Sequence, residues 1–332
     1  MAAVNLRTLV AGALAVTLGL VAAQAQTSPP TWPTRPVTMV VPFAAGGPID
    51  TVGRIMAPNL SEALGQQVVI ENVGGAGGMT GALRVAKAAP DGSQFALGNV
   101  GTHAVGYSMA KDPPYHPTKD FEPVALFARL SLVLVARKNL PAANLQEFIA
   151  YAKANQAKMQ FASAGAGSAT HLGCALLNAA AGIDVTHVPY RGGSPAMQDV
   201  VAGRIDYICI DTPVAGPLVA GGQLKALAVL TRARSPAMPD LPTAQEQGLT
   251  DFEATNWTAF FLPKGTPAPI VQRLHAATVR AIESPDVQKR MKDVGIDPVP
   301  PEQMSQAYLA TFVDSELAKW AGAIKASGLA PQ

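Results

Sequence analysis

Apolar positions along the chain alternate between two spacings, and the alternation predicts a repeated strand–helix order. Val37–Val41 is a short β-branched run that predicts a buried strand. Pro48–Leu64 has the apolar spacing of one helix face and is followed by Gly65, a residue that commonly ends helices. A strand at Val68–Ile70 and a glycine-rich loop at Gly74–Gly78 come next. The pattern then gives a helix near Thr80–Ala89 and a strand at Phe95–Leu97.

The same alternation restarts after Val124 and continues to the end of the chain. The expected strands are Leu132–Val135, Met159–Phe161, Val185–Val188, Tyr207–Ile210, Leu227–Val229 and Thr258–Leu262. The expected helices are Asn144–Asn155, Ser168–Ala181, Ser194–Ala202, Ile270–Glu283, Pro285–Val294 and Pro301–Ala326. Strands that alternate with helices indicate βαβ units and mostly parallel sheets. The chain is long enough for two α/β lobes.

The first 25 residues have the features of a secretory signal peptide. Arg7 precedes an apolar run from Leu9 to Val21, and Ala23-Gln24-Ala25 has the small-x-small form of a cleavage site. The run is too short to cross a bilayer comfortably, which takes about 20 residues. We therefore expect cleavage after Ala25 and a periplasmic mature protein that begins with a Pro-rich lead-in, residues 26–36.

Composition excludes several classes of protein. Hydrophobic residues make up 48% of the chain and charged residues 14%, with a formal net charge of +2. Charged residues average about 25% in soluble domains, so the chain is neither disordered nor a nucleic-acid binder. Cys174 and Cys209 are the two cysteines. An exported protein permits a disulfide between them, but two buried free thiols are the simpler interpretation.

Ligands of open α/β sheets bind beyond the carboxyl ends of the strands. This rule directs attention to four expected loops, which are Pro42–Gly47, Asn99–His103, Ala162–Ser168 and Asp211–Pro213.

The first of these loops combines a Gly-Gly turn with a helix start. Gly46 and Gly47 precede Pro48 at the expected first helical position. Helix N-termini leave backbone N–H groups unpaired and carry partial positive charge, so this loop is a candidate anion site. Asp50 either pairs with Arg54 one turn later or orders a water or a ligand group.

The loop that begins at Ser163 repeats this arrangement. Small residues precede Ser168, which we expect to be a helix N-cap, and Thr170 and His171 follow it. Capping alone explains Ser168 and Thr170 as well as ligand binding does. A lone histidine such as His171 is more often structural than functional.

Motifs for enzymes and cofactors fail at specific positions. Gly192-Gly193-Ser194-Pro195-Ala196 approximates the nucleophile elbow but lacks its last glycine. The segment Gly74–Gly81 misses the dinucleotide fingerprint by one residue, because Gly75 and Gly77 are followed by Thr80 where the fingerprint has a glycine. No nucleophile–base pair or metal-binding pattern assembles, so we expect no cofactor, no metal and no catalytic residue.

At these residues the chain resembles the extracytoplasmic solute receptors of tripartite tricarboxylate transporters, the Bug or TctC-like family. The motifs that carry the resemblance are Pro42–Asp50 with Arg54, Val69–Asn72 followed by Gly74–Gly78, Ser163–Leu172, Val188–Gly192 with Pro195 and Ala196, Gly203–Asp206 leading to Asp211, and Pro263–Pro267. Their order spans essentially the whole mature chain.

The resemblance implies an α/β fold of the periplasmic binding protein type II kind, with two lobes and a ligand cleft between them. Lobe 1 comprises residues 37–130 and 256–332, and lobe 2 residues 131–255. The chain crosses between the lobes near Ala128–Leu132 and again near Ala254–Trp257.

The resemblance also implies a site and its partners. The substrate-binding positions are Phe43, Gly46, Gly47, Ile49, Asp50, Ser163, Gly165, Ser168, Thr170, His171 and Asp211. Ile49 stands where many relatives have a small polar residue. The expected partners are a small carboxylate ligand and the permease subunits of a tripartite tricarboxylate transporter, with the receptor itself a monomer.

Two other functions remain open from the sequence. An exported hydrolase would convert the bound acid and lose activity when Ser194 or His171 is changed. A ligand sensor would share the cleft but serve a signalling partner, and a histidine kinase gene beside this one would favour it. The sequence does not select one organic acid.

Overall fold

The computed structural model describes residues 32–326. The predicted signal peptide and its cleavage site lie outside these residues. The strands are β1 Val37–Val41, β2 Val68–Asn72, β3 Gln94–Asn99, β4 Phe121–Arg137, β5 Gln160–Ser163, β6 Thr186–Pro189, β7 Tyr207–Asp211, β8 Leu224–Val229, β9 Thr255–Pro263 and β10 Ile296–Pro298. The helices are α2 Pro48–Leu64, α3 Met79–Ala86, α4 Gly106–Met109, α5 Leu145–Asn155, α6 Ala169–Ala181, α7 Gly193–Val201, α8 Thr212–Ala220, α9 Ala268–Glu283, α10 Pro285–Asp293 and α11 Gln306–Ala326. Short helical turns are η1 Ala76–Gly78, η2 Gly101–Val105, η3 Gln156–Lys158 and η4 Pro301–Gln303.

The strands form one curled sheet, in the order β2-β1-β3-β9-β4-β7-β5-β6, with β10 and β8 also paired to β4. The three strands β2, β1 and β3 are parallel, as are β7, β5 and β6. The strands β4 and β9 run antiparallel to each other between these two groups. The strand–helix alternation correctly predicts an α/β fold, but the sheet is mixed and not mostly parallel, because β4 and β9 run antiparallel to the strands beside them.

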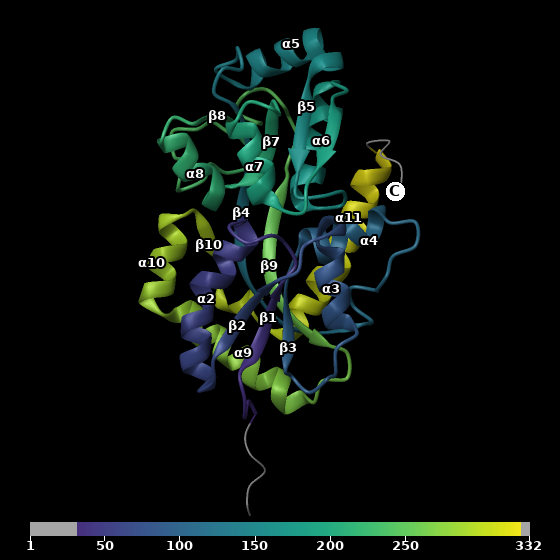
Figure 1. Cartoon of the computed structure of the whole chain (residues 1–332), viewed down its shortest axis with the longest axis vertical. Coiled ribbons are helices and arrows are strands. Elements are labelled where there is room, and N and C mark those ends of the chain that lie inside the picture. Colours follow the sequence, from purple (N-terminus) through teal and green to yellow (C-terminus); the bar gives the residue numbers. More distant parts are fainter. Residues whose placement is uncertain (1–31, 327–332) are drawn as a thin grey trace, which may run out of the picture.

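Strand β4 is the element that joins the two halves of the molecule (Figure 1). Its first part, Phe121–Ser131, pairs with β9, whereas Leu132–Arg137 pairs with β7 and β8. The chain passes from one part of the sheet to the other between Ser131 and Leu132, and it returns at Thr255, where β9 begins. We call the part built on β1–β3, β9 and β10 the first half and the part built on β5–β8 the second half.

Each half has its own apolar core. In the first half Phe95 and Phe260 pack edge to face, with ring centroids 5.2 Å apart, and Trp257 and Trp320 are also buried. In the second half separate clusters cover the two faces of its sheet. Within residues 32–326, no helix combines the length and apolar character needed to span a bilayer.

Helix α2 begins and ends as its sequence dictates. Pro48 occupies the first turn, where a missing N–H costs nothing, and Gly65 closes the helix in the left-handed conformation at φ +75°. Gly53 faces the sheet inside the helix, and a Cβ there would lie 3.3 Å from the side chains of Met39 and Leu97. The helix thereby packs closely on β1 and β3.

Three predicted elements differ from the structure, and several observed elements were not predicted. The region around Val124, where the sequence pattern restarts, lies inside the long strand β4, whose pairing register with β9 shifts between Pro123 and Ala125. The expected loop Asn99–His103 winds into η2, with His103 buried and stacked on Phe261. Helix α11 begins at Gln306 rather than Pro301, which lies in the short turn η4. Helix α8 was not expected.

The preferred interpretation of Cys174 and Cys209 as free thiols is wrong, because the structure joins them in a disulfide. Their Cα atoms are 5.3 Å apart, within the span a disulfide requires. The bond ties α6 to β7, two elements that the fold places side by side although they are distant in the sequence.

We expect this disulfide to stabilise the fold by about 2–4 kcal/mol, because it closes a loop in the unfolded chain. Urea unfolding of the protein with and without a thiol reductant measures the difference. A C174A/C209A double variant is the control and should not respond to reductant. Equal stability of the oxidised and reduced wild type would contradict the prediction.

Candidate functional site

The two halves face each other across a narrow gap, which we call the central gap. It is lined by Phe43, Pro48, Ile49, Asn99, Ala164, Ser168, Ala169, Thr170, Gly193, Asp211 and Asn256. It encloses only about 20 Å³. A single water needs about 10–15 Å³ of such space. The two halves are therefore closed on each other, and a ligand larger than one water molecule can enter only if the halves separate.

The N-termini of four helices meet at this gap. Pro48 and Ile49 begin α2, Ala169 and Thr170 begin α6, Gly193 begins α7, and Asp211 caps α8. Helix geometry leaves the first N–H groups of each helix without an intrahelical acceptor. Each N-terminus also carries partial positive charge. The gap thus collects hydrogen-bond donors and positive potential without using a cationic side chain in its lining.

The two hydroxyl groups at the start of α6 leave one proton to share. Ser168 Oγ accepts from the N–H of His171 at 3.2 Å, and Thr170 Oγ1 accepts from the N–H of Ala164 at 2.7 Å. The hydroxyls are 3.0 Å apart, so one donates to the other. The second hydroxyl proton has no acceptor among the described residues and is available to a ligand.

Two asparagines in the lining were missed by sequence analysis. The side-chain oxygen of Asn99 accepts from the N–H of Thr102 at 3.0 Å, which leaves its amide N–H₂ unpaired within the described chain. Asn256 donates from Nδ2 to both carboxyl oxygens of Asp211, at 3.1 and 3.3 Å. Asn99 ends β3 and begins one of the predicted loops, which was the available signal. Asn256 is the second residue of β9, next to Thr255, and carried no such signal.

Asp211 is a buried acid at the end of β7. Its exposed fraction is 2%, and Asn256 is the one side chain that donates to it among the described residues. Burial raises the pKa of Asp211 to about 7, against the lowering effect of the Asn256 amide. Asp211 is therefore largely protonated below neutral pH.

Of the positions predicted to bind substrate, the lining includes Phe43, Ile49, Ser168, Thr170 and Asp211. The others are not among its lining residues, namely Gly46, Gly47, Asp50, Ser163, Gly165 and His171.

Asp50 braces the first loop from behind. Its Oδ2 accepts from the N–H of Gly46 at 2.8 Å and from Arg54 Nε at 2.7 Å, and its Oδ1 accepts from the Asn72 amide at 2.9 Å. Burial alone would raise the pKa of Asp50, but these hydrogen bonds hold it below its usual range. Gly47 is the N-cap of α2, so Asp50 fixes the turn that aims this helix at the gap.

Ser163 and His171 brace the second loop in a similar way. Ser163 Oγ accepts from the N–H of Gly165 at 3.0 Å and lies 2.6 Å from His187 Nε2. His171 Nδ1 accepts from the N–H of Gly167 at 3.2 Å. Burial lowers the pKa of His171 to about 4, so the ring is neutral. The Ser163–His187 contact is a serine–histidine pair, but neither residue lines the gap.

Glycines let the two halves approach each other closely. A Cβ at Gly192 would lie 2.7 Å from the nitrogen of Ala44, and a Cβ at Gly74 would lie 2.6 Å from the carbonyl oxygen of Arg191. Neither distance is possible for a real side chain without movement. The glycine-rich segments of both halves are thus closure contacts as well as loops near the gap.

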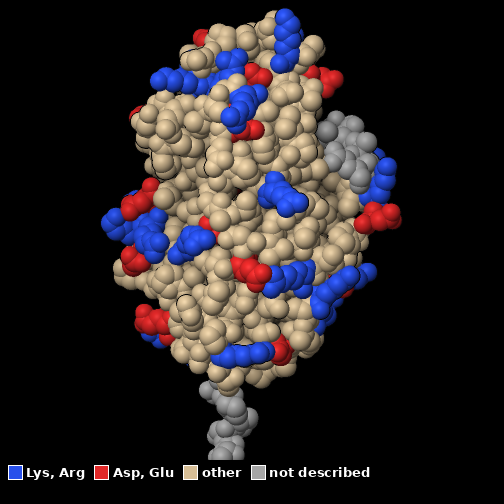
Figure 2. Space-filling view, viewed as in Figure 1, with Lys and Arg blue, Asp and Glu red and all other residues tan. Residues whose placement is uncertain are grey.

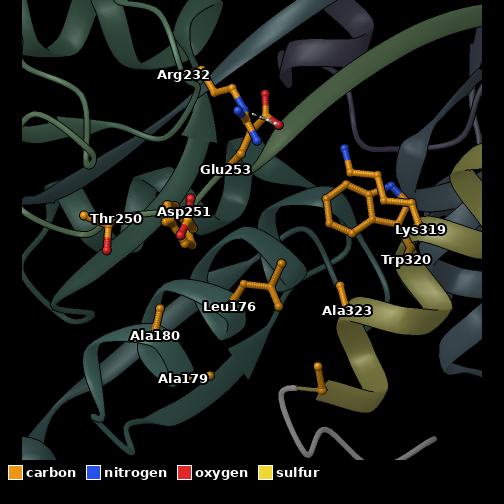
Figure 3. A pocket seen from close by; sticks show the side chains of 12 residues that line it. Leu176, Ala179, Ala180, Arg232, Thr250, Asp251, Glu253, Lys319, Trp320 and Ala323 are labelled. Atoms are coloured by element: carbon orange, nitrogen blue, oxygen red, sulfur yellow. Dashed lines mark hydrogen bonds and ion pairs between the residues drawn. The ribbon is translucent and has the colours of Figure 1, made fainter.

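A larger groove of about 480 Å³ lies between the second half and α11, and Figure 3 shows its residues. Its cations are already engaged, since Arg232 pairs with Glu253 at 3.3 Å and Lys319 lies 4.7 Å from the Trp320 ring centre. The last turn of α6 also lines it, and the C-terminal end of a helix repels anions. The opposite end of the same helix faces the central gap, which is therefore the better anion site.

The face of the molecule shown in Figure 2 has no charged patch that would indicate a second binding site for an anion. Figure 2 shows Lys, Arg, Asp and Glu side chains interspersed around the visible face, with no large patch of one sign. Within the described residues, no group of three or more His, Cys, Asp or Glu side chains is placed to hold a metal ion.

Comparison with known proteins gives a consistent match. A sequence model described as "Tripartite tricarboxylate transporter family receptor" matches residues 52–329. A UPF0065 protein of Agrobacterium vitis is 40% identical over 306 residues, 92% of this chain and 87% of that protein. Protein BugT of Bordetella pertussis is 34% identical over 307 residues, 92% of this chain and 93% of BugT.

Solved structures agree with these relatives. The periplasmic binding protein BugD superimposes with a TM-score of 0.88 at 38% identity, covering 91% of this chain and all of BugD. MatC from Rhodopseudomonas palustris, solved with bound malate, gives 0.86 at 42% identity over 88% of this chain and 100% of MatC. The R. palustris protein Rpa4515, solved with adipate, gives 0.86 at 34% identity over 91% of this chain and 100% of its own.

Replacing Asp50 by Asn should loosen the first loop and lower the free energy of unfolding by about 1–3 kcal/mol at pH 7, because it weakens a buried charge-assisted network. The folded pKa of Asp50 is depressed, so its contribution is present above the unfolded value of about 3.9 and is lost as pH falls through the folded pKa. The difference between wild type and Asp50→Asn should therefore shrink below about pH 4.

Urea unfolding between pH 3 and 7 measures this difference. Asp286→Asn is the matched control, since Asp286 forms an exposed i,i+4 pair with Arg290, and such pairs contribute little. Equal effects of the two substitutions at pH 7 would contradict the bracing role of Asp50.

Proposed function

The chain belongs to the tripartite tricarboxylate transporter receptor family, and from this premise we propose that it captures a small carboxylate in the central gap and delivers it to a membrane permease. Its relatives and structural neighbours are substrate-binding proteins and not enzymes. The family comprises periplasmic receptors. The ligand class, the delivery step and the residues of the site are the proposed part.

One observation carries the proposal, which is the meeting of four helix N-termini at a gap shared by both halves. Each helix contributes about 0.3–1 kcal/mol to an anion at its N-terminus, and up to about 2 kcal/mol when partly buried. Unpaired donors on Asn99 and on the Ser168–Thr170 hydroxyl pair add directed hydrogen bonds. Phe43 and Ile49 supply apolar walls for a carbon skeleton. The malate and adipate bound to two similar proteins are carboxylates of this kind.

Capture and release require the two halves to move relative to each other. The two strands β4 and β9 are the covalent crossings between the halves, so we propose that the halves move about Ser131–Leu132 and Ala254–Thr255. A ligand that bonds to both halves stabilises the closed form, because only that form offers both sets of donors. The permease would then recognise the closed receptor.

Replacing Ser168 by Ala should reduce carboxylate affinity about tenfold or more, because it removes one hydroxyl of the donor pair and disturbs the start of α6. It should also cost about 0.5–2 kcal/mol of stability as a lost N-cap. Titration calorimetry with a panel of malate, adipate, succinate and benzoate measures the affinity.

Asn144→Ala is the matched control, since Asn144 caps α5 by accepting from the N–H of Glu147 and lies outside the gap. The two variants should lose similar stability, but only Ser168→Ala should lose affinity. Equal binding by both variants would place the ligand elsewhere.

Replacing Gly192 by Ala should hold the halves apart without touching the ligand. The φ of Gly192 is 169°, an extended conformation open to any residue, so the substitution adds no backbone strain. The new Cβ would collide with Ala44 of the other half in the closed form only. We expect weaker carboxylate binding at nearly unchanged stability, together with a larger radius of gyration by small-angle scattering when the ligand is present.

The control for this variant is Gly322→Ala, where a Cβ on α11 meets nothing within 4 Å. It should bind and close like the wild type. Wild-type affinity in Gly192→Ala would contradict a closure-dependent site.

A further inference from the structure

The carboxyl group of Asp211 has an unusual place in a site built for anions. Every other polar group of the lining is a donor or is neutral, and Asp211 is the one titratable side chain among the lining residues. An ionised Asp211 would repel a carboxylate in a gap that encloses about 20 Å³. An ionised ligand and an ionised Asp211 are therefore unfavourable together in this gap.

The partners of Asp211 suit an acid better than an anion. An ionised carboxylate has about four acceptor sites, yet the donors to Asp211 are one side-chain amide, Asn256 Nδ2, which contacts both of its oxygens, and its own backbone N–H. A protonated Asp211 instead has an O–H to donate. The side-chain oxygen of Asn256 already accepts from the N–H of Trp257 at 3.0 Å. No acceptor for the Asp211 proton exists among the described residues, and a carboxylate oxygen in the gap would supply one.

The charged groups on the surrounding elements are engaged elsewhere. On α2, Asp50 pairs with Arg54, and on α7, Asp199 binds Tyr190 and Arg204. On β4, Arg129 donates to Gln303 and lies over Phe312. On α6, His171 stacks on His187, and Asp297 lies on β10, opposite Arg129 in the register. None of these lines the gap, so no cationic side chain offsets an Asp211 charge there, and the helix N-termini that would do so are the same ones that a ligand carboxylate needs.

We propose that Asp211 binds the ligand as the neutral acid, donating its proton to a ligand carboxylate, so that this receptor takes up one proton with each anion it captures above neutral pH. The proposal deepens the proposed function and rests on it. The raised pKa of Asp211, about 7, agrees with the geometry. Opening the gap admits water to Asp211 and favours its ionised form, so closure on a ligand and protonation reinforce each other.

Asp211 joins the two halves, which makes its protonation relevant to closure as well as to binding. It ends β7 in the second half, where it lies opposite Leu132 in the register, whereas Asn256 belongs to β9 of the first half. A ligand that accepts the Asp211 proton therefore also bonds at the pivot between the halves.

The test compares wild type with Asp211→Asn, whose amide donates in every protonation state and keeps the shape of the acid. Titration calorimetry uses malate, adipate, succinate and benzoate between pH 6 and 9, over which ordinary carboxylic acids, with pKa values near 4, are ionised. Two buffers of different ionisation enthalpy give the number of protons taken up at each pH.

For the wild type we expect affinity to fall about tenfold per pH unit above the pKa of Asp211, and proton uptake to rise towards one. In Asp211→Asn both quantities should stay flat, with affinity at pH 9 at least equal to that of the wild type. Asp297→Asn is the control, because Asp297 is an acid with a raised pKa that lies on β10, exposed and outside the gap. It should follow the wild type.

Three results would decide against the proposal. Constant wild-type affinity and no proton uptake across this pH range would overturn it without any variant. An Asp211→Asn variant that folds but binds at least tenfold more weakly than wild type at every pH would show that Asp211 acts as an ionised acceptor. If none of the four acids binds the wild type at any pH, the proposed function fails, and this inference fails with it.

Discussion

A helix leaves its first backbone N–H groups without acceptors, and this protein brings four such helix ends to one gap. In the proposed function, this arrangement binds a carboxylate with helix dipoles instead of a buried cation. A buried cation would lose its hydration whenever the gap closed, and that desolvation often cancels the attraction gained. Backbone N–H groups are already fixed by their helices and lose no side-chain entropy. The loops around the gap are consequently built to hold helix starts in place, and their own polar groups, such as Asp50 and Ser163, point backwards into the loops.

Strand β9 lies between the central gap and helix α11. Successive strand residues point to opposite faces. Asn256 accordingly lines the gap, whereas Trp257 donates from Nε1 to Glu316 on α11 at 2.8 Å. The same Glu316 oxygen accepts from Trp320 Nε1 at 2.8 Å. This buried carboxylate fastens the C-terminal helix to the pivot, so the last helix of the chain stabilises the first half where the strands cross.

Local patterns predicted the elements whose ends carry strong signals. Helix α2 follows from Pro48 and Gly65, and α6 from Ser168, because caps act within one turn. Helix α8 was missed because Pro213 and Pro217 suggest a loop, although Pro213 lies in the first turn and α8 continues through Pro217.

The site was only partly predictable for a different reason. The importance of Asn99 and Asn256 comes from strands β3 and β9, which are far apart in the chain and adjacent in the sheet. The Cys174–Cys209 bond likewise depends on how α6 lies on β7. Spacing along one sequence contains no information about such neighbours, whereas the family resemblance indicated the loops because their order is retained.

The glycine-rich segments have a second physical meaning that the sequence interpretation did not include. The segments at Gly74 and Gly192 were compared only with the dinucleotide fingerprint and the nucleophile elbow, but both glycines lie where backbone meets backbone between the halves. Such contacts bury little apolar side chain, and hydrophobic stabilisation scales with the apolar area removed from water. A large apolar contact between the halves would hold the receptor closed without any ligand, and a ligand shifts an equilibrium only by its difference in affinity for the two states. Glycine contacts keep the intrinsic free energy of closure small, so that the bonds a ligand makes to both halves decide the state.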